Sequence, residues 1–217
     1  MKIISFSGID GSGKGTQIEL LEKYLKQKNI SFKTIWARGS WTPGIELVKM
    51  IVRQDKDYTE EQKDEYRKEA RTNPKKQRII LIISILDLLW YWGIYYRLVA
   101  LSGKLLICDR YIWDTFIDFK VNFSNFNFDK WLLWKVLVKI IPTPYPSFVF
   151  MISADESVRR GMLKQEAHME SLEIKTSKAE EYIKLINDNK WSHPIDGNLD
   201  AVAIHQMIVK ILSHEDR

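Results

Sequence analysis

Gly8-Ile9-Asp10-Gly11-Ser12-Gly13-Lys14-Gly15-Thr16 decides the fold of this 217-residue chain. A strand-like apolar run, 2–7, precedes it, and a run with helical spacing, 16–27, follows it. A glycine, four residues and then Gly-Lys, placed between a strand and a helix, is the spacing of a phosphate-binding loop. Loop N–H groups and the helix N-terminus attract anionic oxygens, and glycines let the backbone approach them. We therefore expect a nucleoside triphosphate to bind here.

Lys14 supplies a mobile positive charge for the outer phosphates. The usual motif has Ser or Thr directly after this lysine, where the hydroxyl reaches magnesium. Here Gly15 takes that position, and Thr16 follows one residue later. Thr16 is therefore the candidate hydroxyl ligand for the metal. The residues expected to bind the triphosphate are Gly8, Gly11, Ser12, Gly13, Lys14, Gly15 and Thr16.

The composition is that of an ordinary globular domain, with 45% hydrophobic and 28% charged residues. A net charge of +5 suits nucleic acid, an anionic membrane or small phosphorylated ligands. The sequence has no long basic block and no aromatic-basic repeat, so we favour phosphorylated ligands over nucleic acid. Cys108 is the only cysteine, which rules out an internal disulfide and fits a reducing cytoplasm. The short apolar run at the N-terminus predicts no signal peptide.

The stretch 79–96 is apolar except for Ser84 and Asp87, and its length is close to that of a membrane span. The alternative is a helix that is buried on nearly all sides of an α/β core. Asp87 would be costly in lipid but natural beside a polar pocket. Because the phosphate-binding loop also implies a soluble nucleotide fold, we expect a core helix and no stable membrane span.

Strand-like and helical runs alternate along the chain, which favours parallel β-α-β units. The expected strands are 2–7, 32–37, 104–108, 147–151 and 191–195. The expected helices are 16–27, 42–52, 74–101, 129–141, one that opens at the capping box 153–156, 177–188 and 199–212. The highly charged stretch 55–71 is expected to be an exposed helix or a lid-edge segment, with a solvated face as the simpler interpretation.

Two of the expected strands end in residues suited to phosphate chemistry. Arg38 follows the second strand in a turn-rich loop, 38–44, and ligands gather at the carboxyl ends of parallel strands. It could hold a substrate phosphate or be a solvated loop cation. Asp109-Arg110-Tyr111 follows the apolar strand 104–108. Asp109 occupies the place of a magnesium-organising carboxylate, with Arg110 directed at the same phosphates; the alternative is a structural Asp–Arg pair.

A cationic cluster lies on the helix that opens at 153–156. Arg159, Arg160 and Lys164 are close together there. They could close over phosphates and stabilise transition-state charge, or form an ordinary exposed helix face. Both readings stay open.

Along nearly its full length the chain resembles the thymidylate kinases and their relatives among the nucleoside monophosphate kinases. The resemblance rests on the stretch 8–14, on Arg38 with Thr42-Pro43-Gly44, on 106–111, on the basic helix around Arg159 and on 195–198. It implies one α/β P-loop kinase domain over 1–217, with a five-stranded parallel sheet, helices on both faces and a lid at about 153–170.

The resemblance also implies an activity, namely magnesium-dependent phosphoryl transfer from ATP to a nucleoside monophosphate, with dTMP as the first candidate. Family members are commonly homodimers. By resemblance, the roles fall on Lys14 for the ATP phosphates, Asp10 for the acceptor sugar hydroxyl, Arg38 and Arg110 for the acceptor phosphate, Asp109 for magnesium, and Arg159 and Arg160 for the lid.

The departures from the family cluster on the acceptor side. Where the family has an arginine that reads thymine and an aromatic residue one turn earlier, this chain has Leu88 or Leu89 and Ser84 or Ile85. Where the family has a serine and then tyrosine and glutamine, it has Asp114 and then Asp118-Phe119. A different small-molecule acceptor is therefore an alternative. A non-catalytic nucleotide-binding protein is a further one, and Asp109 and Arg110 argue against it.

Overall fold

The computed structural model describes residues 3–36, 73–165 and 169–215. The chain divides into two compact units, which are described separately. The first comprises Met1–Ala37, Leu98–Val121 and Thr143–Arg217, and the second comprises Arg38–Arg97 and Asn122–Pro142. Arg38, the helix expected over 42–52 and the charged stretch 55–71 lie outside the described residues.

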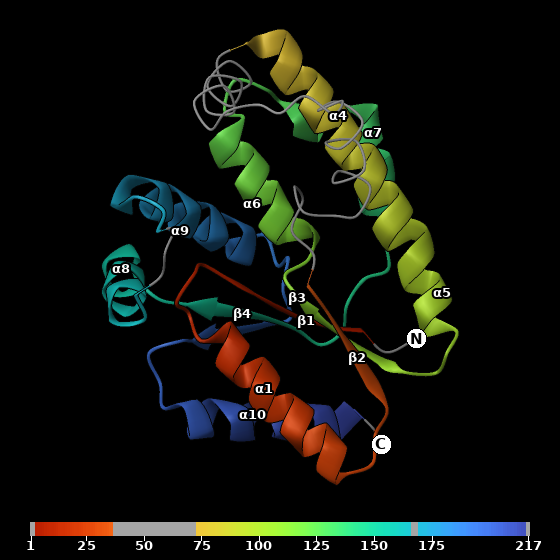
Figure 1. The fold of residues 1–217 in the computed structure, drawn as a ribbon, viewed down its shortest axis with the longest axis vertical. Coiled ribbons are helices and arrows are strands. Elements are labelled where there is room, and N and C mark those ends of the chain that lie inside the picture. Colours follow the sequence, from red (N-terminus) through yellow and green to blue (C-terminus); the bar gives the residue numbers. More distant parts are fainter. Residues whose placement is uncertain (1–2, 37–72, 166–168, 216–217) are drawn as a thin grey trace, which may run out of the picture. The chain divides into compact units, whose positions relative to one another are not determined.

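The first unit is built on a five-stranded parallel sheet with the strand order β2-β3-β1-β4-β5 (Figure 1). The strands are β1 (Ile3–Gly8), β2 (Phe32–Trp36), β3 (Leu105–Asp109), β4 (Ser147–Met151) and β5 (His193–Asp196). The three inner strands are mostly buried and read as continuous apolar runs, as expected for strands covered on both faces. The predicted five-stranded α/β sheet is confirmed.

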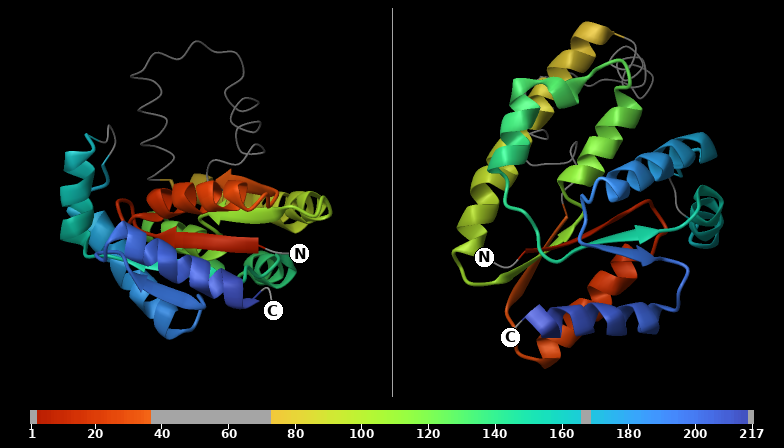
Figure 2. Two further views of the ribbon diagram at one scale, coloured as in Figure 1. Left: turned by 90° about the horizontal axis from the view of Figure 1, so that it is seen from below. Right: turned by 180° about the vertical axis from the view of Figure 1, so that it is seen from behind.

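Helices α1 (Lys14–Gln27) and α10 (Ala201–Glu215) lie side by side against one face of this sheet (Figures 1 and 2). The helical spacing of the apolar residues in α1 places one stripe inward. The core on this face contains Ile4, Phe6, Ile18, Leu21, Leu25, Ile107, Phe148, Phe150, Ile195, Ile204 and Ile208.

Helices α6 (Ile112–Asn122) and α9 (Leu172–Asn187) supply the core on the other face. The buried residues there are Ile9, Ile117, Val149, Ile152, Tyr182, Leu185 and Trp191. Helix α8 (Ala154–Leu163) packs against α9 and begins at Ser153, whose side chain accepts a hydrogen bond from the N–H of Glu156. The predicted capping box therefore does start a helix. Helix α9 begins earlier than predicted, because Ser171 caps it.

The described part of the second unit is helical. Helix α4 (Pro74–Trp90) begins after Asn73, whose side chain accepts from the N–H groups of Lys75 and Lys76, as its sequence predicts. It continues through a π-helical turn, η1 (Tyr91–Tyr95), into α5 (Tyr96–Ala100), which runs on into the first unit. Within the second unit α4 packs against α7 (Leu132–Ile140), which follows the short 3₁₀ turn η2 (Phe128–Lys130).

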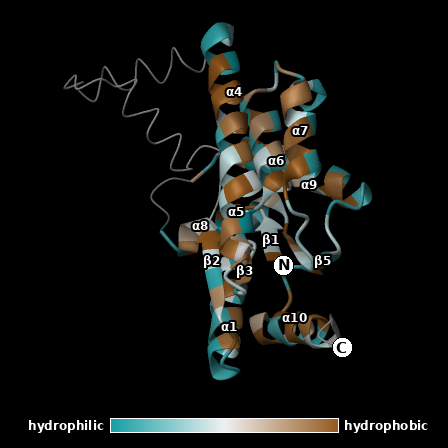
Figure 3. Ribbon diagram, turned by 90° about the vertical axis from the view of Figure 1, so that its right-hand side faces the viewer, coloured by the Kyte–Doolittle hydropathy of each residue, from teal (hydrophilic) through white to brown (hydrophobic). Residues whose placement is uncertain are grey.

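The helix over Pro74–Val99 is long and apolar enough to cross a membrane, judged by length and composition alone. Of the most apolar 18-residue stretch of this helix, only 39% is buried. Leu81, Ile85 and Leu88 are nevertheless fully buried, which fits the expected core helix. Figure 3 shows the apolar residues along α4 and α7. The exposed apolar side chains on the long helix include Ile79, Ile80, Leu86, Trp90, Ile94 and Leu98.

Replacement of Leu21 by Ala tests the core beneath α1. Leu21 is fully buried between the helix and the sheet, so its truncation should lower the free energy of unfolding by about 2–5 kcal/mol. Denaturant unfolding monitored by tryptophan fluorescence would measure the loss. Lys23→Ala, at an exposed position of the same helix, is the control and should change stability by no more than about 0.5 kcal/mol. Equal effects of the two changes would contradict this packing.

Candidate active site

The loop between β1 and α1 folds as its glycines predict. Gly8 has a φ of 136°, and a Cβ there would lie 2.5 Å from the carbonyl oxygen of Phe150 on β4, so only glycine fits. Gly13, at a φ of 98°, precedes the first residue of α1, and no side chain among the described residues caps that end of the helix. The first N–H groups of α1 are therefore left for an anion.

The ammonium of Lys14 lies inside this loop rather than in solvent. Its Nζ donates to the carbonyl oxygens of Gly8 at 2.8 Å and Ile9 at 2.9 Å, and to Oγ of Ser12 at 3.3 Å. Burial, with a smaller contribution from the nearby Arg110 cation, lowers the pKa of Lys14 from 10.5 to about 7. The loop therefore holds a cation with neutral oxygen partners, and an incoming phosphate would supply the missing negative charge.

Asp109 stands at the carboxyl end of β3, next to the loop strand β1 in the sheet. Its Oδ1 atom is buried and has no hydrogen-bond partner in the described part of the chain. Burial raises the pKa of its carboxyl group, opposed by the charges of Lys14 and Arg110. An unsatisfied buried carboxylate oxygen beside a phosphate-binding loop is suited to a divalent cation.

The described residues contain no cluster of three or more His, Cys, Asp or Glu side chains that could hold a metal ion. A metal here would therefore depend on substrate phosphates for most of its ligands, as magnesium usually does. Thr16 is exposed in the first turn of α1, and open space surrounds Gly15. Asp109 and Thr16 are therefore the candidate ligands for a magnesium ion that would arrive with a triphosphate.

Arg110 is held from several directions. Its backbone is left-handed, at a φ of 74°, and its N–H donates to the carbonyl oxygen of Phe6 at 2.9 Å. Its guanidinium donates to the carbonyl oxygen of Gly8 at 3.1 Å, forms an ion pair with Asp10 and lies 3.6 Å from Asp114. Asp10 and Arg110, both predicted for the acceptor side, are therefore brought together at the phosphate-binding loop.

The two arginines that were predicted to belong to a lid take different places. Arg159 has a side chain that is 63% exposed, and it pairs with Glu156. Arg160 also bonds Glu156, but its Nη1 reaches the carbonyl oxygens of Gly11 at 3.1 Å and Gly197 at 3.0 Å. Hydrogen bonds from Arg159 and Arg160 lower the pKa of Glu156 to about 2, so it stays charged. Arg160 therefore touches the loop, and Arg159 remains at the surface.

Several residues support the loop through contacts that the sequence does not predict. Ser157 on α8 donates from Oγ to the carbonyl oxygen of Asp10 at 2.5 Å, and the buried Lys175 donates to Oγ of Ser157 at 2.9 Å. A Cβ on Gly197 would lie 2.8 Å from the carbonyl oxygen of Ser12, so this glycine lets the loop after β5 touch the phosphate-binding loop. These contacts join residues far apart in the chain, which no local pattern reveals.

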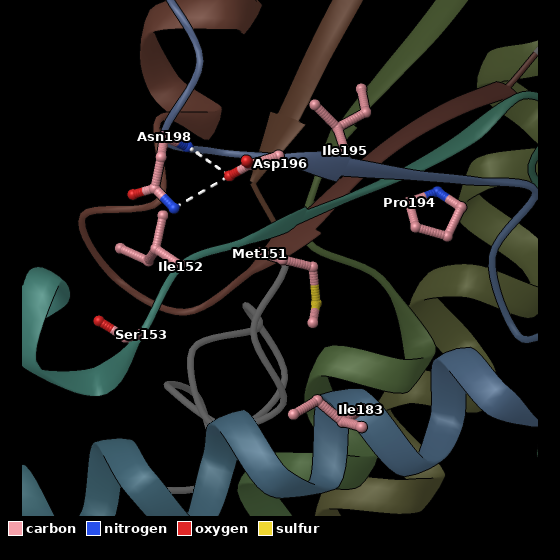
Figure 4. Close-up of a pocket in the computed structure, with 8 residues that line it drawn as sticks. All are labelled: Met151, Ile152, Ser153, Ile183, Pro194, Ile195, Asp196 and Asn198. Atoms are coloured by element: carbon pink, nitrogen blue, oxygen red, sulfur yellow. Dashed lines mark hydrogen bonds between the residues drawn. The ribbon is translucent and has the colours of Figure 1, made fainter.

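A hollow of about 490 Å³ lies at the carboxyl ends of β4 and β5, beside α9 (Figure 4). Met151, Ile183 and Pro194 give it an apolar lining, and Asp196 accepts two hydrogen bonds from Asn198, each at 2.9 Å. Lys14, Asp109 and Arg110 are not among its lining residues. We therefore place the candidate site at the loop and assign no ligand to this hollow.

Comparison with known proteins places the chain among relatives that share one name. No protein-family model matches it. It is 26% identical to a thymidylate kinase of Caldanaerobacter subterraneus subsp. tengcongensis, over 96% of this chain and 93% of the relative. It is 24% identical to a thymidylate kinase of Kosmotoga olearia, over 95% and 93%, and 25% identical to one of Fervidobacterium nodosum, over 97% and 98%. The similarity therefore extends along nearly the whole of each chain.

The lowered pKa of Lys14 predicts a pH-dependent stability. In the unfolded chain the lysine keeps its proton up to about pH 10.5, whereas in the folded protein it loses the proton near pH 7. Between these values the unfolded state binds more protons, so its free energy relative to the folded state rises with pH. The difference in unfolding free energy between the wild type and Lys14→Met should therefore shift by about 2 kcal/mol in favour of the wild type from pH 7 to pH 9.

Denaturant unfolding of the two proteins at a series of pH values would measure this gain. Lys23→Met provides the control, since its side chain is exposed and its curve should stay parallel to that of the wild type. A Lys14→Met curve that also stays parallel would mean that the ammonium is not confined in the loop.

Proposed function

We propose that this divergent member of the thymidylate kinase family transfers the γ-phosphoryl group of ATP to a nucleoside monophosphate, with dTMP as the first candidate acceptor. The observation that carries the proposal is the Lys14 ammonium enclosed by the loop at the start of α1. A triphosphate bound there would replace neutral carbonyl partners with anionic oxygens. The named relatives, matched over nearly their full length, support the class of reaction.

At the donor end, the glycine-rich loop and the first turn of α1 would bind the ATP phosphates, with Lys14 on the outer ones. Magnesium would be held by Asp109, with Thr16 as the candidate hydroxyl, and it would neutralise charge on the transferring group. Arg160 would stabilise the loop through Gly11, and Arg159 would be free to turn toward the phosphates. Such chemistry requires mainly positioning and charge stabilisation from the protein.

At the acceptor end, Arg110 would hold the acceptor phosphate together with Arg38, and Asp10 would approach the sugar hydroxyl. Arg110 is already paired with Asp10, whose side chain is 34% exposed. An acceptor phosphate would take over donors of Arg110 from Asp10, which would release that carboxylate for a hydroxyl group. Without substrate, Asp10 and Arg110 would thus pair with each other, and each would exchange this partner for a group of the acceptor when the acceptor binds.

A different acceptor is the second candidate, and two observations favour it. Leu88, at one of the two positions where the family has a base-reading arginine, is fully buried. Asp118, where the family has a tyrosine, is buried in an ion pair of 2.7 Å with Lys178, which also bonds Glu170. A site without its base-reading hydrogen bonds loses discrimination. The acceptor would then be another phosphorylated small molecule that reaches the same arginines.

The assembly and the compartment also belong to the proposal. Leu86, Trp90 and Ile94 are 50%, 62% and 45% exposed along one helix. An apolar helix surface of this kind is suited to a second copy of the chain. We propose that two copies of the chain pair through this surface as a homodimer. We also propose that the protein is cytoplasmic.

ADP release from MgATP, measured with the purified protein against dTMP and the other nucleoside monophosphates, tests the function. Stimulation by at least one nucleotide is expected, and Lys14→Met should abolish it because the outer phosphates lose their cation. Lys23→Met should behave as the wild type. Full turnover by Lys14→Met, or no stimulation by any nucleoside monophosphate, would overturn the proposal.

Replacement of Gly15 by Ser tests the magnesium assignment. Within the described part of the chain, no atom lies within 4 Å of a Cβ built at Gly15, so the added hydroxyl should fit and supply a direct ligand. The magnesium concentration that gives half-maximal turnover should therefore fall, whereas Gly15→Ala should leave it unchanged. An equal response of the two variants would show that the hydroxyl does not reach the metal.

A further inference from the structure

The carboxylate of Asp114 lies directly beneath the phosphate-binding loop, and nothing in the proposed function has used it. Its side chain is completely buried. One oxygen accepts from Oγ of Ser7 at 2.5 Å and the N–H of Tyr111 at 3.0 Å. The other accepts from the N–H of Gly8 at 3.3 Å and the hydroxyl of Tyr182 at 2.5 Å. Four donors use the acceptor positions of an ionised carboxylate fully.

These donors come from three separate elements. Ser7 and Gly8 end β1, Tyr111 belongs to the turn that follows β3, and Tyr182 lies on α9. Burial, with a further contribution from Asp114, raises the pKa of Tyr182, so its hydroxyl remains a donor at neutral pH. Asp114 therefore fixes the start of the phosphate-binding loop relative to the turn that carries Arg110.

Asp114 also faces the guanidinium of Arg110, with 3.6 Å between its Oδ1 and Nη1. The other terminal nitrogen of the guanidinium, Nη2, pairs with Asp10. The two carboxylates differ in freedom, because the Asp10 side chain is 34% exposed and that of Asp114 is wholly enclosed. When a substrate phosphate displaces Asp10, Asp114 is the partner that stays in place.

We propose that Asp114 is a positioning residue for phosphoryl transfer, which orients Arg110 toward the acceptor phosphate and ties this orientation to the phosphate-binding loop. The family that this chain resembles has a serine at this position. A serine hydroxyl offers two acceptor sites and no charge, so it could not hold the same four donors. This chain therefore orients its arginine with a buried anion. The inference rests on the proposed function, because it assumes that Arg110 meets an acceptor phosphate.

Steady-state kinetics of Asp114→Asn and Asp114→Ser, with ATP and the acceptor varied separately, test the role. A misplaced arginine should lower kcat/KM for the acceptor by about 100-fold and leave the KM for ATP within about threefold. Thermal unfolding would be followed in parallel. Ser192→Ala is the matched stability control, because it removes the part-buried hydrogen bonds between its Oγ and the backbone of Ser147, at the amino ends of β4 and β5. It should lower the Tm without changing the kinetic constants.

Should the Asp114 variants fail to fold, the double variant Ser7→Ala/Tyr182→Phe keeps the carboxylate and removes two of its donors. It should lower kcat/KM for the acceptor by about tenfold. An equal rise in the KM for ATP and in the KM for the acceptor would overturn the proposal, and so would a fall in Tm without any kinetic change.

A spectroscopic measurement separates failure of this inference from failure of the proposed function. The NMR signals of the Arg110 guanidinium N–H groups can be assigned by their loss in Arg110→Lys. In the wild type they should be resolved, because both Nη groups are hydrogen-bonded and the guanidinium therefore rotates slowly. Loosening of Asp114 should broaden them. If the Asp114 variants broaden the Arg110 resonances but the wild type phosphorylates no nucleotide, the positioning of Arg110 by Asp114 stands and the proposed function is refuted. Unchanged resonances in every folded variant would refute the positioning.

Discussion

At the carboxyl end of β1, three charged side chains lie almost out of contact with water. Lys14, Arg110 and Asp114 are all buried, and each must find its partners within the protein. Lys14 finds carbonyl oxygens of the loop, Arg110 finds a carbonyl and two carboxylates, and Asp114 finds four donors. Because these partners come from β1, the turn after β3, and α9, the position of one charge limits the positions of the others.

The sheet makes this concentration of charge tolerable. Apolar cores on both faces, beneath α1 and α10 and beneath α6 and α9, hold the strands so that their carboxyl ends meet at one edge. The cost of desolvating the charges is offset by hydrogen bonds that are already in place before any substrate binds. The candidate site is therefore preorganised at the loop, whereas Arg159 remains exposed at the surface.

Local patterns were sufficient to predict the strands, the phosphate-binding loop and the carboxylate at the tip of β3, because each follows from a short run of residues. Lys14 and Asp109 lie where such patterns predict. The helix α6 was not predicted, since its apolar residues follow the turn at Tyr111 without a clear signal. Asp114 could not be recognised as a support for the loop, because its partner Ser7 is 107 positions away in the chain.

The acceptor side was predicted least well for a related reason. Its expected residues were identified by resemblance, and the chain departs from the family there. Asp118 and Lys178 form their ion pair between α6 and α9, so only the fold brings them together. Arg38 lies outside the described residues, and its expected role remains a prediction.

The π-helical turn Tyr91–Tyr95 has a consequence for comparing this chain with others. Such a turn accommodates one residue more than an α-helix of the same rise, and one residue corresponds to a rotation of about 100° around the helix axis. Trp92 and Tyr96 are both fully buried across this turn. A regular helix aligned with this segment without a gap would therefore pair inward-facing positions on one side of the turn with outward-facing positions on the other. A single-residue deletion within the turn would be expected to convert it to a regular α-helix and to leave both flanking segments facing as they do now.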